Sequence, residues 1–269
     1  MLKAHLTLEV VRQWQNQKIP LGFTDAPAVM QGCVPTHPAR PKNVLTVPMS
    51  RVKQGGRKAM IHSVAHAESY AIDLMWDIVL RFGSLHGFQG TGSGPRRSSA
   101  PTVLPALPID FFNDWIRIAG DEARHFMSWE KRLRDMGSHY GELPGHDGLW
   151  DAAEQTSHSL CERLALVHMV HEARGLDVVR VQLAKLQRAG DSESAATMEK
   201  NHRDEITHVA AGVKWYEWLC AKQGCDPIQK WHALLKEKFG GKLLGPFNTE
   251  ARTEAGMSTE YYQPYLNAE

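Results

Sequence analysis

The stretch AGDEARHFMSW, residues 119–129, places a carboxylate and an imidazole on the apolar face of a predicted helix. Glu122 and His125 are three residues apart and share that face with Ile118 and Trp129. An isolated ionised carboxylate in a dry core costs several kcal/mol, so it needs a neutralising partner. The sequence therefore has to supply a group that cancels this charge.

Three other predicted helices also carry a glutamate inside an apolar stripe of helical period. Glu68 is central in the first, and Glu172 is central in another, where Gly175 leaves space one turn further on. The last carries Glu205 and His208, which repeat the spacing of Glu122 and His125. The apolar residues of these three stripes are Ile61, Val64, Ala65, Ala71, Ile72, Met75 and Val79; Cys161, Leu164, Leu176, Val179, Leu183 and Leu186; and Met198, Val209, Gly212, Trp215 and Leu219.

Two single glutamates and two Glu-x-x-His pairs, in alternating order, match the ligands of dinuclear carboxylate proteins with a ferritin-like bundle. Two divalent cations would cancel the charge of four carboxylates and turn a destabilising cluster into a satisfied one. Oxygen and imidazole donors at an open site favour iron or manganese over a structural zinc. We therefore expect two metal ions per chain, with Fe preferred and Mn or a mixed Mn/Fe pair as alternatives. The expected metal ligands are Glu68, Glu122, His125, Glu172, Glu205 and His208.

A single Glu-x-x-His pair is common on solvated helices, and such accidental pairs are the alternative interpretation. Several independent features favour a metal site instead: the position of each carboxylate within its stripe, the order of the ligands and the length of each helix. In addition, both pairs follow an aspartate, in DEARH and in DEITH.

Composition and charge restrict the class of protein. The chain has 269 residues, of which 42% are hydrophobic and 23% charged, as in a folded globular protein. Its net charge of +1 indicates neither nucleic acid nor an anionic membrane as a partner. From the pattern of apolar residues we expect neither a signal peptide nor a membrane span, and the four cysteines form no CxxC motif. We expect a cytoplasmic protein with reduced thiols.

Proline and glycine divide the chain into three expected parts. Residues 1–56 hold a short helix, 7–17, and a Pro-rich extended segment that packs on the core. Residues 57–222 form an all-α, ferritin-like four-helix bundle with helices 57–82, 110–136, 149–188 and 192–221. Its long loop, 83–109, is either decoration or a lid. Residues 223–269 form a C-terminal helix, which follows Asp226 and ends near residue 239, and an irregular tail.

Several motifs resemble known families. DEARH and DEITH, with HAESYAIDLMWD before them and HEARGLDV between them, resemble the ferritin-like superfamily. PARPKNVLTVP, AIDLMWDIVLRF, YGELPGHDGLW, EARGLD and DEITHVAAG resemble the uncharacterised DUF455 family, over most of residues 35–220. This resemblance implies the architecture and leaves the substrate open. Oxygen-activating relatives often read D/E-E-x-R-H, a pattern that Arg124 fits and Thr207 breaks.

The aspartate before each pair is expected to support a metal ligand. In the wider superfamily such a residue often hydrogen-bonds a ligand histidine. One residue is a turn of 100° on a helix, so Asp121 and Asp204 point away from the ligand face of their own helix. We predict that Asp121 reaches His208 and that Asp204 reaches His125; solvated surface aspartates are the alternative.

Three more side chains are candidates for contact with the ligands or the substrate. His168 is one turn before Glu172, and His202 is three residues before Glu205; each has a hydrogen-bonded core role as its alternative. Tyr216 is either redox-active or, as we favour, packed with a satisfied hydroxyl. His62 and His66 are expected to be surface or packing residues.

These features predict an O2-activating oxidase or monooxygenase in which the metal centre itself is the catalytic group. Its partners would be O2, a small-molecule substrate and an external electron-donor protein; the oligomeric state is left open. The first alternative is a ferroxidase or an iron-storage or iron-handling protein without an organic substrate, and a weaker one is a bundle with a structural metal. The segments before and after the bundle exceed what a storage-cage subunit needs, which favours the enzyme.

Overall fold

The computed structural model describes residues 1–19, 34–48, 51, 55–83, 107–240 and 243–265. Much of the predicted Pro-rich segment and nearly all of the loop 83–109 lie outside this part. The described part is helical, and its one β pairing is an isolated bridge between Thr46 and Gly145. The predicted all-α class is therefore confirmed for these residues. None of their helices has an apolar run long enough to cross a membrane.

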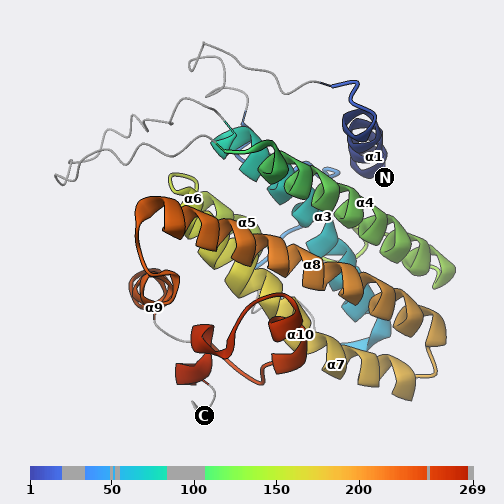
Figure 1. Ribbon diagram of the computed structural model, residues 1–269. Coiled ribbons are helices and arrows are strands. Elements are labelled where there is room, and N and C mark those ends of the chain that lie inside the picture. Colours follow the sequence, from blue (N-terminus) through green and yellow to red (C-terminus); the bar gives the residue numbers. More distant parts are fainter. Residues whose placement is uncertain (20–33, 49–50, 52–54, 84–106, 241–242, 266–269) are drawn as a thin grey trace.

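Four long helices lie at the centre of the molecule: α3 (Gly56–Phe82), α4 (Ile109–Asp135), α7 (Glu172–Arg188) and α8 (Ser192–Gln223). Helix α3 packs along α4, α7 packs along α8, and α8 also contacts α4 (Figure 1). Helix α1 (Leu2–Gln15) packs on the outside of α4. That this arrangement is ferritin-like, and that the chain has three parts, stay predictions.

Local signals place the ends of α8. Asp191 caps its first turn by accepting a hydrogen bond from the backbone N of Ser194, at 3.1 Å. Gly224 ends it in the left-handed conformation, with φ +65°. These caps define the short connection between α7 and α8 and the turn that follows α8. The next helix, α9 (Pro227–Lys238), agrees with the predicted C-terminal helix.

The predicted continuous helix 149–188 is wrong. The segment contains α5 (Gly148–Gln155), a turn, α6 (Leu160–Glu162), a π-helix (Arg163–His171) and then α7. Thr156 Oγ1 donates to the carbonyl of Ala152 at 2.9 Å, and Ser159 Oγ accepts from the N of Glu162 at 3.3 Å. Hydroxyl groups that bond the backbone compete with helix propagation, and two of them end α5 and start α6 here.

The π-helix lies against α8 at a glycine. A Cβ built on Gly212 would lie 2.8 Å from the carbonyl oxygen of His168, closer than real Cβ atoms approach backbone. A glycine at this position therefore allows the wider π turn to pass next to α8, which carries two of the expected ligands.

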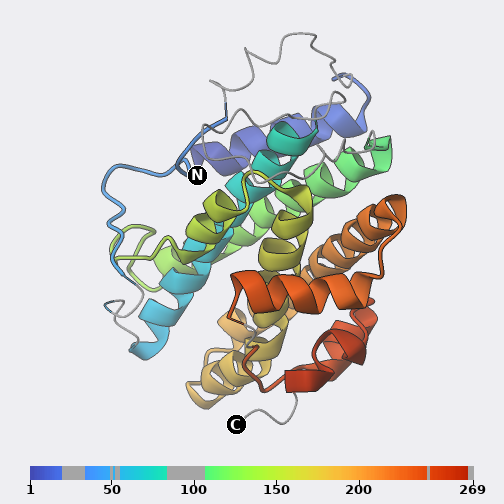
Figure 2. The ribbon, with the colours of Figure 1, turned by 90° about the vertical axis from the view of Figure 1, so that its left-hand side faces the viewer.

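The two chain ends also differ from expectation. Helix α1 begins earlier than the predicted 7–17 and ends at Gln15, before Gln17 at φ +56°. The tail is not wholly irregular, because it contains α10 (Thr249–Glu254) and two 3-10 turns (Thr259–Tyr261 and Gln263–Tyr265). Buried Arg252 pairs with buried Asp177 of α7 at 2.7 Å. This ion pair links α10 to α7. The C-terminal segment, drawn in red, lies on the side of the molecule away from α1 (Figure 2).

The motifs PARPKNVLTVP and YGELPGHDGLW meet in space. The backbone N of Gly145 donates to Leu45 O, and Val47 N donates to Gly145 O, both at 2.9 Å. His66 lies beneath them, within 2.9 Å of Tyr140 Oη, and a Cβ on Gly145 would clash with its ring. His62 accepts a hydrogen bond from the N of Gly141 at 2.9 Å. Both histidines are thus buried packing residues, as expected.

Candidate metal centre

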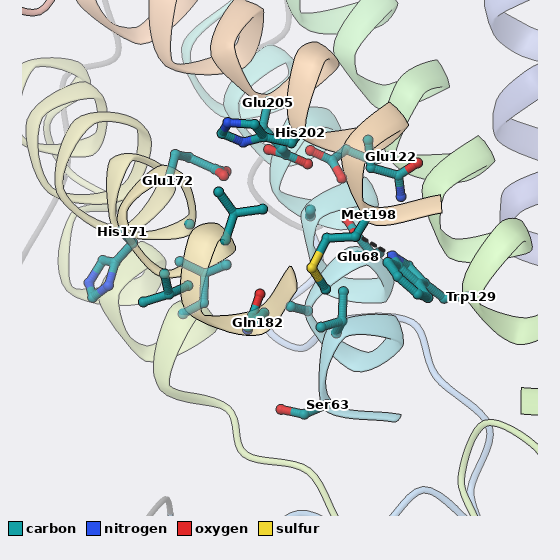
Figure 3. A pocket seen from close by; sticks show the side chains of 18 residues that line it. Ser63, Glu68, Glu122, Trp129, His171, Glu172, Gln182, Met198, His202 and Glu205 are labelled. Carbon is teal, nitrogen blue, oxygen red and sulfur yellow. Dashed lines mark hydrogen bonds between the residues drawn. The ribbon is translucent and has the colours of Figure 1, made fainter. Parts of the chain in front are cut away.

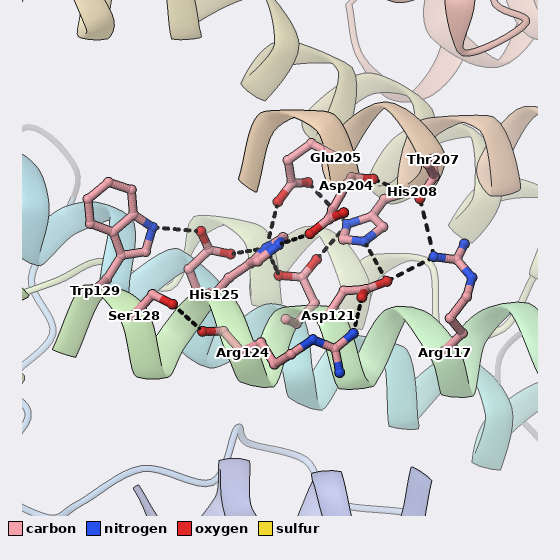
Figure 4. Close-up of polar contacts among 12 residues, drawn as sticks. Arg117, Asp121, Arg124, His125, Ser128, Trp129, Asp204, Glu205, Thr207 and His208 are labelled. Atoms are coloured by element: carbon pink, nitrogen blue, oxygen red, sulfur yellow. Dashed lines mark hydrogen bonds and ion pairs between the residues drawn. The ribbon is translucent and has the colours of Figure 1, made fainter. Parts of the chain in front are cut away.

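Four of the six expected ligands come together between α3, α4 and α8. One ligand atom from each of Glu68, Glu122, His125 and Glu205 lies within 4.8 Å of the others, so this group could hold a metal ion. Glu122 and His125 are 1% and 2% exposed. His125, Glu205 and His208 point toward one another across the two helices (Figure 4).

Glu122 and Glu205 lie between the two histidines. The Nδ1 atom of His125 is 3.7 Å from Glu122 Oε2 and 3.2 Å from Glu205 Oε1. The Nδ1 atom of His208 is 3.0 Å from Glu122 Oε1 and 3.2 Å from Glu205 Oε2. Each carboxylate therefore presents one oxygen to each imidazole, a geometry suited to bridging two cations.

Glu68 and Glu172 lie beside this pair. Glu68 Oε2 is 3.8 Å from His125 Nδ1, and its Oε1 accepts a hydrogen bond from Trp129 Nε1 at 3.2 Å. Glu172, at the start of α7, lies outside the group of four but lines the same cavity. Its Oε1 is buried and makes no hydrogen bond among the described residues.

Burial controls the charge of the single glutamates. It raises the pKa of Glu68 to about 8 and that of Glu172 well above its usual range. Neighbouring Glu122 and Glu205 raise the pKa of Glu172 further. Without a cation, protons would have to neutralise these two carboxyls.

The two histidines behave in the opposite sense. Burial lowers the pKa of His125, but its hydrogen bond with Asp204 and the nearby carboxylate of Glu122 outweigh this effect and raise the pKa well above 6.5. Burial likewise opposes the charge of His208, whose pKa is raised by Glu205 and Glu122. The carboxylates thus stabilise positive charge at both imidazoles.

Unsatisfied atoms show that the residues present fit a metal ion. Both oxygens of Glu122, Oε1 of Glu172 and Nδ1 of His125 are buried without a hydrogen bond in the described structure. A buried polar atom without a partner costs about 1–3 kcal/mol. For Glu122 and His125, ion-pair contacts within the cluster offset part of this cost. The unsatisfied atoms are oxygen and imidazole donors facing one space, and a divalent cation would satisfy them together.

The outer nitrogen of each histidine faces an aspartate of the opposite motif. His125 Nε2 is 3.1 Å from Asp204 Oδ2, and His208 Nε2 is 3.4 Å from Asp121 Oδ2 (Figure 4). The structure brings together the pairs expected from the repeated aspartate. Their effect on metal binding stays a prediction.

Sequence reasoning missed a residue next to these pairs. Arg117 Nη1 lies 2.8 Å from Asp121 Oδ2 and 3.2 Å from Thr207 Oγ1. Its i,i+4 spacing from Asp121 was the available signal. Arg124 also pairs with Asp121. Trp129 was seen only as an apolar landmark, although its indole N–H donates to Glu68.

A cavity of about 280 Å³ adjoins the carboxylates, between α3, α7 and α8. Glu205, Glu172 and Glu122 gather at one end, and Ser63 lies at the other (Figure 3). His202 lines this cavity.

The other two candidates lie elsewhere. His168 is 1% exposed, its ring packs on Trp115 at 4.3 Å between centroids, and it does not line the cavity. Its Nε2 makes no hydrogen bond among the described residues, so its core role is packing and not the expected hydrogen bond. Tyr216 is buried and donates from Oη to the carbonyl of Pro227 at 3.0 Å, so its hydroxyl is satisfied. Both side chains have the packing contacts of core residues.

Comparison with known proteins gives a family and one curated relative. A family model described as "Protein of unknown function (DUF455)" matches residues 1–263. An uncharacterized protein from Haemophilus influenzae is 35% identical over 203 residues, which are 76% of this chain and 65% of that protein. The aligned part thus covers less than two thirds of that relative. No solved structure matches the chain significantly.

Proposed function

This chain belongs to the DUF455 family, whose function is unknown, and from its buried cluster we propose that it is a ferritin-like protein with a dinuclear metal centre. The expected resemblance to DUF455 is confirmed and extends beyond residues 35–220. One observation carries the proposal: each of the carboxylates of Glu122 and Glu205 directs one oxygen to one histidine and its other oxygen to the second histidine. A single cation would not need two carboxylates placed in this way.

Each ligand has a distinct role in this proposal. Glu122 and Glu205 would be shared by two metal ions, His125 and His208 would hold one ion each, and Glu68 and Glu172 would complete the set. Asp204 and Asp121 accept the Nε2–H of the two imidazoles and so keep Nδ1 free for the metal. Fe is the proposed metal, with Mn or a mixed Mn/Fe pair as the alternative.

The function that fits best is oxidation of a small organic molecule with O2. A bound pair of Fe(II) ions would supply two of the four electrons that reduce O2 to the level of water, and the organic substrate would supply the other two. An external electron-donor protein would reduce the ions again. The chain itself holds the ions in a buried site, where Trp129 and Met198 form apolar walls and limit access of water. Storage or simple ferroxidase activity is the second candidate. The cavity beside the carboxylates favours an organic substrate over storage.

Metal counting with O2 uptake tests the proposal. Protein prepared anaerobically with Fe(II) should bind two ions per chain and consume O2 on exposure, whereas Glu122→Gln should lose tight binding of both. Binding of one ion or none would reject the dinuclear centre. Continued uptake of iron far beyond two ions per chain would instead support storage.

A further inference from the structure

The walls of the 280 Å³ cavity are mostly apolar. Val64 and Ala71 of α3, Val178 and Val179 of α7, and Met198 of α8 line it (Figure 3). No lysine or arginine is among the described residues that line it, so these residues offer an anion no permanent positive charge. Its acidic end is the carboxylate cluster, whose charge two divalent cations would cancel.

The rim of the cavity is made of small residues. Ser63, Ala67 and Gly175 line the cavity and are themselves exposed. A Cβ built on Gly175 would meet no atom within 4 Å, so this side of α7 is open space. Glycine inside a helix is unfavourable relative to alanine, and here it leaves that space free.

The size of the cavity limits its occupant. A water-sized group takes about 30 Å³ in a liquid, so 280 Å³ holds a molecule on the order of ten heavy atoms. Gln182 and Ser63 supply hydrogen-bonding groups away from the carboxylates. An uncharged molecule would lose little hydration here. An anion would be desolvated beside cations whose charge four carboxylates already cancel, and without a lysine or arginine among the described lining residues.

We propose that this cavity binds compact, uncharged molecules with an apolar body, which enter beside Gly175 and lie against the carboxylate end. The proposal that these molecules are the substrate class rests on the proposed function. The proposal that the cavity binds them depends only on the cavity itself. Compounds bearing phosphate or other permanent negative charge are excluded from it.

Calorimetric titration of protein loaded with Zn2+, which undergoes no redox chemistry, tests this site. The probes are toluene, indole and 2-naphthol, and the anionic control is naphthalene-2-sulfonate. At least one neutral probe should bind, and 2-naphthol should bind at least about tenfold more tightly than the sulfonate. The same titrations on metal-free protein separate the cavity from the metal centre.

Gly175→Leu places a side chain in the open space at the rim and should weaken binding of the neutral probe at least about tenfold. Ala196→Leu adds similar bulk to an exposed position of α8 that does not line the cavity, and should bind the probe as the wild type does. Metal content should be unchanged in both variants, and neither should melt below the wild type, because leucine favours the helix more than Gly175 does. These two measurements show whether Gly175→Leu weakens probe binding by filling the cavity or by disturbing the fold.

Each result has one meaning. If no neutral probe binds, if the sulfonate binds equally well, or if folded Gly175→Leu retains binding, the inference is overturned even where two metal ions are bound. If neutral probes bind as expected but the protein holds fewer than two metal ions, the cavity stands and the proposed function fails.

Discussion

The two Asp-Glu-x-x-His motifs have the same spacing but different surroundings. On α4, the side chain of Asp121 is 9% exposed and pairs with Arg117 and Arg124. On α8, the side chain of Asp204 is 42% exposed, and no lysine or arginine of the described residues pairs with it. One aspartate is therefore buried and held by two arginines, and the other is partly exposed and held by His125 alone among the described ionic partners.

This difference makes it possible to compare two properties by which an aspartate could support a ligand histidine: the hydrogen-bond distance, and the burial and orientation of the carboxylate. The more exposed pair has the shorter distance, 3.1 Å for Asp204 and His125 against 3.4 Å for Asp121 and His208. Solvent screens an exposed charge and leaves its side chain mobile, so a buried and oriented carboxylate should fix an imidazole more firmly. If orientation matters more than the distance, Asp121 contributes more to metal binding than Asp204.

Both motifs are proposed to bind the metal ions, so removing the metal should have the largest effect of all, a lower melting temperature. A metal present at about 1,000 times its Kd stabilises by about 4 kcal/mol, so chelation should lower the melting temperature by about 10 °C. Glu172→Gln removes a buried carboxyl, so its metal-free form should melt above metal-free wild type while binding metal more weakly. Scanning calorimetry measures the melting temperatures of both proteins with and without metal. Equal melting temperatures before and after verified metal removal would contradict a buried metal cluster.

Asp121→Ala should weaken metal binding by about 100-fold, the upper end for loss of a histidine's carboxylate partner. The variant removes the acceptor of His208 and leaves two arginines near an imidazole. Competition with a chelator of known affinity measures the loss. Asp110→Ala, at an exposed position of the same helix, is the control and should bind as wild type.

Asp204→Ala should weaken metal binding by about tenfold, the lower end of the same range. Water can replace part of what an exposed carboxylate does for His125. A loss equal to or greater than that of Asp121→Ala would mean that the shorter hydrogen-bond distance, and not burial, decides the contribution.

The identity of the cluster was accessible from the sequence because its signal is periodic. A glutamate inside an apolar stripe has to point inward, and Glu-x-x-His puts both groups on one face. The cross-helix partners of Asp121 and Asp204 were expected from the resemblance to ferritin-like proteins, together with the 100° turn per residue that points them away from the ligand face of their own helix. The helix break at Thr156 could not be predicted, because hydrogen bonds from hydroxyl groups to the backbone interrupt a helix without disturbing its apolar pattern.

The unequal surroundings of the two motifs could not be predicted either. They depend on Arg117 of α4 extending to Thr207 of α8, a contact set by how the helices pack. The sequence shows only that Arg124 has no equivalent at position 207. Exposure of Asp204 depends on the same packing.

Thr207→Arg tests whether the missing arginine accounts for the difference, and we expect the smallest effect from it. Residue 207 stands to Asp204 as Arg124 stands to Asp121, so the new side chain could pair with the aspartate on its own helix. That pair would be exposed, and Arg117 already lies 3.2 Å from Thr207, so repulsion would offset part of the gain. Unfolding free energy, from urea titration, should change by less than about 0.5 kcal/mol, and metal affinity by no more than a factor of about two. A tenfold gain in affinity would show that a cationic partner, and not burial of the carboxylate, makes Asp121 the stronger support.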